Sequence, residues 1–576
     1  MKTKIQSYGN SYSKFIRTSI FGLFLCLGIG AKSQPTITSF SPSSGPVGTT
    51  VILSGTNFNT TASNNIVYFG ATKANVSLAS TTSLTVTVPS GATYENISVT
   101  NNTTNLTGYS TKPFTLTFAC GAPTDSTSFS TATSFGTAMW PQDAKICDFD
   151  GDGKPDIATV NGDSRIVGIL RNIGTGGSIN FAPATYIYGF SALYMCIQDM
   201  DGDGKTDLIV SYSDLSFSVY RNTSSIGSIS FASPIDVTVS SQIQDMSSGD
   251  LDNDGKPDIA VTGVYPHRVN FFRNTSTPGL ISFGPEQLLG AGFFPVGITM
   301  ADIDGDTFND LAVINNDSVV SLYRNISTPG TIAFAPRITI STNNNPKRIT
   351  TGDIDGDGKK DMVTTSYYSN TISTWLNTST MGSISFGTEN SFAGLNPRGA
   401  RIDDLNGDGK PELVVADDYV SIYDNTSAIG TISFAPKVSF SFILETPYNV
   451  AVGDLNDDGK PDIVQANTDG GTLGGQLVTI LENKECLTSG IDSQTNEVTS
   501  FSIYPNPFST NATILFDKEV KNVTITINNT LGQEIKSIDF SGKELQIEKG
   551  DLGSGIYFVR LLYKEGNSST KKIIIK

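Results

Sequence analysis

Short runs of apolar residues, separated by glycine, proline and small polar residues, recur along most of the chain. Many of these runs are brief and rich in β-branched residues, as in Asp156-Ile-Ala-Thr-Val160 and Asp258-Ile-Ala-Val-Thr262. Short β-branched runs bounded by turn residues are typical of β-strands. The pattern therefore predicts an all-β protein.

Between about residues 125 and 486 these runs repeat with a period of about 51 residues. Each unit has a short strand, an acidic loop, a second strand, and a third strand that ends in an Arg-Asn-Thr-Ser-like turn. A Gly-x-Ile-x-Phe segment follows, as in residues 227–231, and we expect it to begin a fourth strand. Four strands per unit, repeated seven times, predict a seven-bladed β-propeller.

The acidic loops have the form D-x-[DN]-x-D-G-x-x-[DE] and return at intervals of 51, 51, 52, 51, 51 and 50 residues. Carboxylates at positions 1, 3, 5 and 9, with the backbone carbonyl of position 7, can converge on one ion. Oxygen-only ligands, several of them charged, suit calcium. Glycine at position 6 allows the sharp turn that the loop needs. The sequence therefore predicts about seven structural calcium sites.

The predicted ligands occupy positions 1, 3, 5, 7 and 9 of each loop, and position 7 contributes its main-chain carbonyl. In chain order they are Asp148, Asp150, Asp152, Lys154, Asp156; Asp199, Asp201, Asp203, Lys205, Asp207; Asp250, Asp252, Asp254, Lys256, Asp258; Asp302, Asp304, Asp306, Phe308, Asp310; Asp353, Asp355, Asp357, Lys359, Asp361; Asp404, Asn406, Asp408, Lys410, Glu412; Asp454, Asn456, Asp458, Lys460 and Asp462. The loop at Asp302 has Thr307 at position 6 and Phe308 at position 7, so we expect it to be among the weaker sites.

Two other interpretations of the loops are an EF-hand and an acidic turn that binds nothing. An EF-hand needs a bidentate glutamate at position 12 and a helix on each side. Position 12 is threonine, valine or glutamine in every loop, and a strand-like run follows each loop, so an EF-hand is excluded. An acidic turn that binds nothing is disfavoured because an unneutralised cluster of four carboxylates is repulsive.

Net charge agrees with the metal hypothesis. The formal charge is −17, and a leader with five basic residues would leave about −22 after removal. The loops hold 26 of the 55 acidic residues, and seven calcium ions would bring the mature chain to about −8. A protein this acidic has no electrostatic footprint for nucleic acid.

Both ends of the repeat array suggest how the ring closes. The last unit stops after its third strand near residue 481, whereas residues 126–135 look like an isolated fourth strand. We expect this segment to complete the last blade, which would leave no long open edge. Cys120 and Cys486 flank the junction, and we expect a disulfide between them. Cys147 and Cys196 adjoin their loops and are expected to be buried free thiols.

The remaining chain falls into four segments. Residues 1–33 have basic residues, an apolar run and small residues in the order of a secretory signal peptide, and no other segment could span a membrane. Residues 34–118 alternate short strands with Gly/Pro turns, as in an immunoglobulin-like sandwich. Residues 487–500 are polar and predict a linker. Residues 501–576 predict a small terminal β-sandwich with a basic tail.

Three regions resemble known families. The repeats in residues 119–486 resemble the FG-GAP/VCBS repeats of integrin-α-like propellers, which implies calcium in the loop joining the first two strands of a blade. Residues 34–118 resemble an IPT/TIG domain. Residues 501–576, with their Y-P-N-P start, L-G-Q-E turn and G-I-Y-F strand, closely resemble the type A sorting domain of type IX secretion. That resemblance implies export across a Gram-negative outer membrane by the type IX machinery, to the cell surface or beyond.

Candidate ligand-binding residues precede the first strands of several units. They are aromatic or basic, and a propeller would gather them on the face opposite the calcium loops: Trp140, Tyr188, Phe294, Arg348, Arg398 and Tyr448. Such side chains suit a patch for a glycan or a protein. The alternative is that they pack between blades.

Catalytic chemistry has little support in the sequence. His267 is the single histidine, and no Ser-His-Asp set, phosphate loop or Cys/His metal cluster occurs. We therefore expect a calcium-binding surface protein, not an enzyme, that acts in adhesion or in glycan or protein binding. The two alternatives are a secreted polysaccharide lyase or hydrolase that uses paired carboxylates, and a structural surface component without a specific ligand.

Overall fold

The computed structural model describes residues 33–118, 123–162, 165–189, 192–212, 215–342, 346–440, 447–467, 477–484, 501–529, 534–550, 552–563 and 568–576. These residues form β-strands and one 3-10 turn, η1 (Ala62–Asn64), but no α-helix, so the all-β prediction is confirmed. None of them belongs to a helix with the length and hydropathy needed to cross a membrane. The chain divides into two compact units, Met1–Glu485 and Cys486–Lys576, which are described separately.

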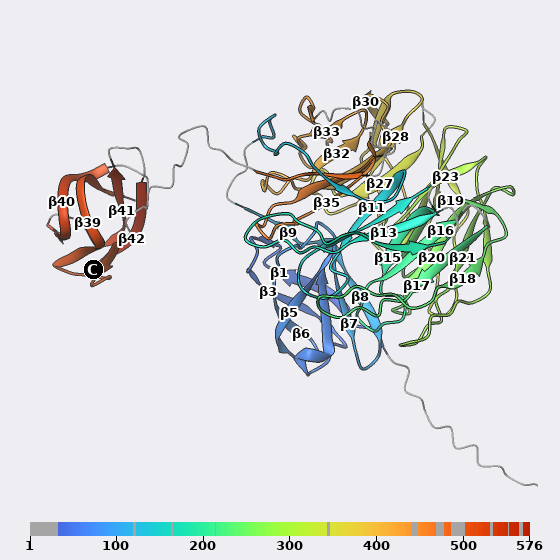
Figure 1. Ribbon diagram of the computed structural model, residues 1–576, viewed down its shortest axis with the longest axis horizontal. Coiled ribbons are helices and arrows are strands. Elements are labelled where there is room, and N and C mark those ends of the chain that lie inside the picture. The colour runs from blue at the N-terminus through green and yellow to red at the C-terminus, as the bar shows by residue number, and fades with distance from the viewer. Residues whose placement is uncertain are drawn as a thin grey trace, which may run out of the picture. The chain divides into compact units, whose positions relative to one another are not determined.

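Seven four-stranded antiparallel sheets form the blades of a propeller, and the chain follows them in order around the ring (Figure 1). The first strands are β11 (Pro141–Cys147), β15 (Ala192–Gln198), β19 (Gln242–Gly249), β23 (Pro295–Ala301), β27 (Arg348–Gly352), β31 (Gly399–Asp403) and β35 (Pro447–Gly453). The second strands are β12 (Asp156–Asn161), β16 (Asp207–Tyr212), β20 (Asp258–Val264), β24 (Asp310–Asn315), β28 (Asp361–Ser366), β32 (Glu412–Ala416) and β36 (Asp462–Asn467).

The outer half of each blade consists of its third and fourth strands. The third strands are β13 (Ile166–Leu170), β17 (Ser216–Tyr220), β21 (Arg268–Phe272), β25 (Val319–Tyr323), β29 (Thr371–Trp375), β33 (Val420–Tyr423) and β37 (Leu477–Leu481). The fourth strands are β14 (Thr185–Tyr188), β18 (Ile235–Thr238), β22 (Gln287–Gly290), β26 (Ile338–Ser341), β30 (Asn390–Ala393), β34 (Val438–Phe440) and, in blade 7, β10 (Thr133–Gly136).

Burial explains which sequence patterns form which strands. Second strands such as β12 are buried at every residue, because neighbouring blades cover both of their faces, and they read as continuous apolar runs. Fourth strands such as β14 alternate between exposed and half-buried residues. Each apolar cluster between blades joins two adjacent sheets; one packs Ala158 and Val160 against Leu208 and Val210. The core is therefore a ring of inter-blade layers.

The ring closes as the sequence predicts. Strand β10, which precedes the first repeat, pairs antiparallel with β37 of the last repeat, from Thr133 opposite Ile480 to Gly136 opposite Leu477. An isolated bridge between Phe129 and Asn483 extends this pairing. Cys120 and Cys486 lie outside the described residues, so their disulfide stays a prediction. Cys147 is a buried free thiol, as expected, and Cys196 is a half-buried one.

The Gly-x-Ile-x-Phe segment does not begin the fourth strand, so that prediction is wrong. In blade 2, Gly227 has a φ of +83° and turns the chain, and Ser225 and Ser228 exchange backbone hydrogen bonds of 3.0 and 2.7 Å. Phe231 therefore pairs back with Asn222, and β18 begins only at Ile235. The Ile-x-Phe alternation imitates a strand, but it belongs to a hairpin that packs against the acidic loops.

A belt of buried asparagines joins each blade to the preceding one. The asparagine after each third strand donates its side-chain Nδ2 to the carbonyl of loop position 2 in the preceding blade. For Asn377 and Ile303 the distance is 2.9 Å, and for Asn483 and Leu405 it is 2.8 Å. The full belt is Asn172, Asn222, Asn274, Asn325, Asn377, Asn425 and Asn483. Because Asn172 reaches the loop of blade 7, the belt runs around the whole ring.

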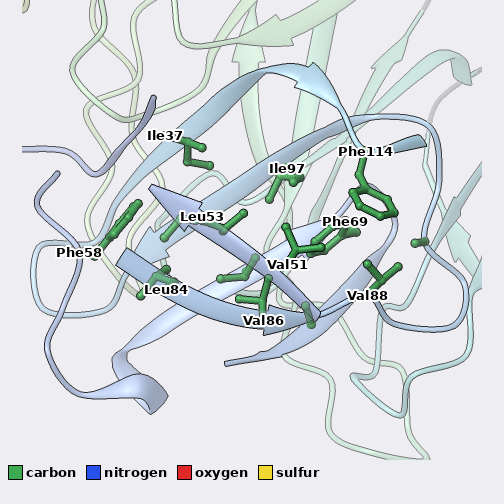
Figure 2. Packing of buried hydrophobic residues seen from close by; sticks show 14 of the residues in the cluster. Ile37, Val51, Leu53, Phe58, Phe69, Leu84, Val86, Val88, Ile97 and Phe114 are labelled. Carbon is green, nitrogen blue, oxygen red and sulfur yellow. The ribbon is translucent and has the colours of Figure 1, made fainter. Parts of the chain in front are cut away.

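The N-terminal sandwich (residues 33–118) has strands β1 (Thr36–Ser41), β2 (Ser44–Gly45), β3 (Thr50–Thr56), β4 (Asn65–Phe69), β5 (Thr72–Ala79), β6 (Ser83–Thr87), β7 (Asn96–Asn101), β8 (Leu106–Pro113) and β9 (Thr115–Leu116). Seven of them follow the order β1-β3-β6-β5-β4-β7-β8, and β2 pairs with β9 in parallel. Figure 2 shows Val51, Leu53, Phe69 and Ile97 pointing between the strands to form its core. Phe69 and Phe114 meet edge to face at 5.5 Å.

The C-terminal unit is a separate small β-domain. Its strands are β38 (Phe501–Tyr504), β39 (Asn511–Asn528), β40 (Glu534–Glu548), β41 (Gly555–Tyr563) and β42 (Ser568–Ile575). The long strand β39 pairs with β38, β40 and β41, and its Ile514, Phe516 and Ile525 lie in a buried core. The predicted linker 487–500 and the predicted leader, up to residue 32, lie outside the described residues.

Replacing Asn377 by alanine is expected to lower the free energy of unfolding by about 2–4 kcal/mol. The side chain donates to the carbonyls of Ile303 and Lys360 and accepts from the amide of Ser379, so its loss leaves buried groups unsatisfied. Thr378→Ala in the same turn is the control, because Thr378 is exposed and bonds only Ser385 among the described residues. Denaturant unfolding that gives equal values for both variants would contradict the belt's role.

Candidate metal loops and an opposite-face pocket

Each acidic loop connects the first and second strands of a blade, as predicted. In blade 1 the carboxylate of Asp148 accepts the amides of Gly151 and Asp152 on Oδ1, at 2.8 and 3.1 Å, and that of Gly153 on Oδ2, at 2.9 Å. Gly153 has a φ of +91°, a conformation that a side chain disfavours. The carboxylate at position 1 therefore holds the turn of the loop through backbone hydrogen bonds, and the other carboxylates of the loop lie beside it.

Five loops bring three carboxylates together with oxygen atoms within 4.8 Å of one another. In blades 2 to 5 the three come from positions 1, 3 and 5, and in blade 1 from Asp148, Asp150 and Asp156. A compact set of three carboxylates suits a hard divalent cation. In blades 6 and 7 position 3 holds Asn406 or Asn456, whose amide oxygen can still serve as a ligand.

The carboxylate at position 9 has a structural role in addition to its predicted role as a ligand. Asp156 is fully buried, and its Oδ2 accepts the amide of Phe149 at 2.9 Å while its Oδ1 accepts that of Asn172 at 2.8 Å. The same two contacts recur in blade 7, where Asp462 accepts from Leu455 and Asn483 at 2.9 Å each. Position 9 thus ties the loop to the third strand of its own blade. Each oxygen keeps a further lone pair for a cation.

Four of the six lysines at position 7 donate from Nζ to a carbonyl of the turn after the third strand, whereas Lys359 and Lys460 lie 3.4 and 3.5 Å from the position 5 carboxylates of their own loops. Lys205 and Lys256 each donate from Nζ to a carbonyl of the turn after the third strand, those of Ser224 and Ser276, at 2.7 Å. This leaves the main-chain carbonyl as the predicted ligand at position 7. In blade 4, Phe308 replaces the lysine, and Thr307 takes a φ of +77° where the other loops have glycine. That strain is consistent with the expectation of a weaker site.

Arginines accompany the loops of blades 1 to 4. Arg273 bonds Asp252 at 2.6 Å and also contacts Asp254, whereas Arg221 lies 3.4 Å from Asp203. In blades 5 to 7 the same position holds Leu376, Asp424 and Glu482, two of them acidic. Blades 6 and 7 are also those with asparagine at position 3. The residue after the third strand therefore offsets the charge of its loop in blades 1 to 4, whereas in blades 6 and 7 an acid at this place accompanies the loss of the acid at position 3.

Burial disfavours the charged form of the loop carboxylates when no metal ion is bound. It raises the pKa of Asp148 to about 6, of Asp250 to about 7, and of Asp156 and Asp258 to about 8, and nearby carboxylates add to the rise. A divalent cation would offset both the desolvation and the repulsion. The donor set and its electrostatics thus fit a bound metal ion, with calcium the ion that all-oxygen ligands favour.

The N-terminal sandwich packs onto the loop face of the propeller. The amide of Asp148 donates to the carbonyl of Ala71 at 3.2 Å, and the carbonyl of Gly204 accepts the hydroxyl of Tyr68 at 3.0 Å. The carbonyl of Gly255 accepts the amide of Thr107 at 2.9 Å. No sequence pattern predicts this contact, which makes the sandwich a cap on the loop face, hydrogen-bonded to the loops of blades 1 to 3.

A central channel runs through the ring of blades. At the end of this channel away from the acidic loops lies a pocket of about 470 Å³, here called the mouth pocket. Six aromatic and three basic side chains line it, together with Gln142, Gln244 and Val296: Trp140, Tyr194, Phe294, Tyr367, Tyr368, Tyr448, Lys347, Arg348 and Arg398. Five of the six predicted ligand-face residues lie here. The sixth, Tyr188, is 75 % exposed on the fourth strand of blade 1 and is not part of the lining.

The channel connects the mouth pocket to the N-terminal sandwich. It has a volume of about 440 Å³ and shares Tyr194 and Arg348 with the mouth pocket, while Thr93, Tyr94 and Glu95 of the sandwich line it as well. Asp143, Asp245 and Arg348 stand at equivalent places on their first strands, five residues before the loop. Arg348 lies 3.9 Å from Asp245. The channel interior is therefore polar, and its charged side chains lie next to side chains of opposite charge.

His267 belongs to an aromatic cluster beside the mouth pocket. Its ring contacts those of Tyr265, Phe293 and Phe294 at centroid distances of 5.7, 4.8 and 6.3 Å. Its Nδ1 accepts the amide of Phe294 at 3.2 Å. This packing role accounts for the single histidine and positions Phe294 in the pocket.

Family models identify all three parts of the chain. A model of the FG-GAP-like repeat matches five overlapping stretches, residues 199–261, 250–313, 302–364, 354–415 and 404–464. A model of the IPT/TIG domain matches residues 35–118, and one of the secretion system C-terminal sorting domain matches residues 502–576. The chain is an FG-GAP-repeat propeller protein with an IPT/TIG domain and a C-terminal sorting domain. The sorting domain indicates export of this propeller protein across the outer membrane, to the cell surface or the extracellular space.

A curated relative matches only a short stretch of the chain. The chain is 37 % identical over 75 residues to an endo-acting ulvan lyase of Formosa agariphila, which covers 13 % of the chain and 14 % of that enzyme. The match thus spans about a seventh of the enzyme and is too short to cover the FG-GAP propeller.

The similarity to solved structures is low in both sequence identity and TM-score. A complex of BBS1N with ARL6DN is 11 % identical, covering 62 % of this chain and 97 % of that chain, with a TM-score of 0.42. An auxiliary nutrient binding protein from Bacteroides thetaiotaomicron is 13 % identical, covering 78 % and 98 %, with a TM-score of 0.28.

The metal-free FG-GAP propeller is expected to lose stability as the pH rises from about 5 to about 8. Buried carboxyls such as Asp156 and Asp258 have a folded-state pKa of about 8, far above the unfolded value of about 4. The folded protein therefore holds more protons in this window, and its stability falls with rising pH.

Thermal melting of chelator-treated protein across this pH range tests the expectation. The melting temperature should drop towards pH 8, and excess calcium should restore it most at the alkaline end. A melting temperature of the metal-free protein that stays level or rises with pH would contradict it.

Proposed function

We propose that this protein is a calcium-stabilised surface propeller that binds a glycan or a protein ligand in the mouth pocket. The observation that carries the proposal is the convergence of six aromatic and three basic side chains on one concavity. A pocket of about 470 Å³ falls within the range of roughly 300–1,000 Å³ that is usual for ligand sites. Export by the sorting domain would present this pocket outside the cell.

Calcium is assigned a structural role in this proposal. About seven loops would each take one ion, through side-chain oxygens at positions 1, 3, 5 and 9 and the carbonyl of position 7. These residues stand at the opposite end of the channel from the mouth pocket, so they would stabilise the ring without touching the ligand. Extracellular calcium modules commonly bind with Kd values of ~10⁻⁴–10⁻³ M. The propeller would then be rigid outside the cell and looser where calcium is scarce.

Adhesion or ligand capture is favoured over catalysis. Within the described part of the chain, the carboxylate clusters that could hold a metal ion are on the loop face, where the N-terminal sandwich covers several loops. The aromatic and basic lining of the mouth pocket offers contact area and hydrogen-bond donors, the features of a recognition site. The three matched family models describe a repeat, a sandwich module and a sorting signal.

A glycan and matrix-protein array, run with calcium and with a chelator, tests this function. The wild-type protein is expected to bind one class of ligand in calcium. Tyr448→Ala should weaken that binding about tenfold or more, because an aromatic side chain central to a pocket commonly carries 1–2 kcal/mol or more. Tyr188→Ala is the matched control, since Tyr188 is exposed outside the pocket.

Three results would count against the proposal. Silence of both arrays would leave the scaffold alternative, and equal binding by Tyr448→Ala and wild type would move the site elsewhere. Turnover of a polysaccharide on the array would return the protein to the enzyme alternative.

A further inference from the structure

The wall of the mouth pocket comes from one position of the repeat, the sixth residue before each loop. In blades 1, 2, 3, 4 and 7 a shift in strand register, a β-bulge, falls at this residue. Bulges redirect side chains, and four of these five residues line the pocket. Lys347 and Arg398 line it as well, directly before β27 and β31. The position varies strongly between blades: Gln142, Leu193, Gln244, Val296, Lys347, Arg398 and Tyr448. Blades 5 and 6 supply basic residues, so one side of the pocket is cationic.

The basic side chains are held in place by aromatic rings. The Arg398 guanidinium lies 4.9 Å from the ring centroid of Tyr367 and 5.7 Å from that of Tyr448. The Lys347 ammonium lies 5.5 Å from the ring of Tyr368 and donates to Asn316 Oδ1 at 2.9 Å. Such cation–π contacts fix the position of each charge at the pocket wall. The described lining includes no carboxylate, so anions meet no repulsion at the wall itself.

Two aromatic residues of the pocket adopt a costly backbone conformation. Trp140 and Phe294, each eight residues before its loop, have φ angles of +64° and +52°. The equivalent residue of blade 6 is Asn396, at +54°, a residue type that tolerates this region. For bulky residues the left-handed region is unfavourable, and it recurs at ligand sites. Placing these rings at the mouth pocket thus costs the fold some stability.

The channel behind the mouth pocket ends at the N-terminal sandwich. Thr93, Tyr94 and Glu95 line the far part of the channel, and a Cβ on Gly453 would lie 3.1 Å from Thr93. Arg348, paired with Asp245 and 4.7 Å from the ring of Tyr194, stands between the two regions. A polymer therefore cannot pass through the ring, and the pocket suits a terminal or side group of a chain.

We propose that the mouth pocket binds an acidic polysaccharide through a carboxylate or sulfate group on one sugar. Lys347 and Arg398 hold the anion, and the aromatic side chains pack against the apolar faces of the sugar rings. Charge-assisted hydrogen bonds to such groups are among the stronger polar contacts. A neutral sugar would leave the basic wall unused, and a flat protein surface would not fill the pocket. This inference rests on the proposed function and names its ligand class.

Binding of full-length, calcium-loaded protein to defined polymers by affinity electrophoresis tests it. The probes are polygalacturonate for carboxylate, dextran sulfate for sulfate, and neutral dextran, with polyglutamate and single-stranded oligothymidine as other polyanions. The variants Arg398→Gln and Lys347→Gln remove one charge each. Arg337→Gln removes an exposed charge outside the pocket lining and is the matched control.

Either acidic polysaccharide is expected to bind, with a dissociation constant that rises on the order of ten- to a hundredfold in Arg398→Gln and Lys347→Gln. Arg337→Gln should match the wild type. Binding of polygalacturonate alone would identify carboxylate as the anion, and binding of dextran sulfate alone would identify sulfate. Comparable melting temperatures for all variants show that folding is intact, and Lys347→Gln serves if Arg398→Gln does not fold.

The inference is overturned if neutral dextran binds as well as the acidic polymers, or if polyglutamate or oligothymidine binds and no polysaccharide does. It is also overturned if both pocket variants bind like wild type, or if no probe binds at all. An array ligand that is lost in Tyr448→Ala would then still support the proposed function, so the two failures are distinguishable.

Discussion

This propeller depends on buried carboxylates that tie each acidic loop to the turn after the third strand of the same blade. Asp156 and its equivalents accept one amide from the loop and one from the turn after the third strand. That turn carries the asparagine that reaches the preceding blade. The same loops hold the clustered acids at positions 1, 3 and 5. The same loop and turn residues therefore stabilise each blade, join it to its neighbour and bind cations. A change in loop charge thus affects the whole ring.

The N-terminal sandwich extends this dependence beyond the ring. Its hydrogen bonds go to the loop backbone, at Asp148, Gly204 and Gly255. The contact is close enough that a Cβ on Gly204 would meet Ile66 at 2.0 Å. Loop 4, where Thr307 replaces the glycine, makes no hydrogen bond to the described residues of the sandwich. In blade 2 the close packing of the sandwich thus adds to the need for glycine, which the positive φ of the turn already favours.

Much of the fold could be predicted because the loops are periodic. Seven loops at a near-constant interval gave the blade count, and the truncated last unit gave the closure by β10. The Ile-x-Phe alternation was misleading, because Gly227 turns the chain before a strand can extend. Packing of the sandwich onto the loops could not be predicted, since small residues such as Ala71 carry no periodic signal.

The mouth pocket was only partly visible in the sequence. Aromatic and basic residues before the first strands pointed to Trp140, Phe294 and Arg398, and they also included Tyr188, which lies elsewhere. Aligning the repeats at the sixth residue before each loop would have added Lys347 and Gln142. Tyr367 and Tyr368 lie between the second and third strands of blade 5, where the repeats share no pattern, and only the structure places them.

Hydrogen–deuterium exchange of the full chain, with calcium and with a chelator, tests the central claim most directly. If the loops join the blades and hold the sandwich, chelation should raise exchange in all the loops, in the asparagine turns and at sandwich residues such as Thr107 together. An increase confined to isolated loops, with the turns and the sandwich unchanged, would show that each cation stabilises only its own loop. That result would contradict the account.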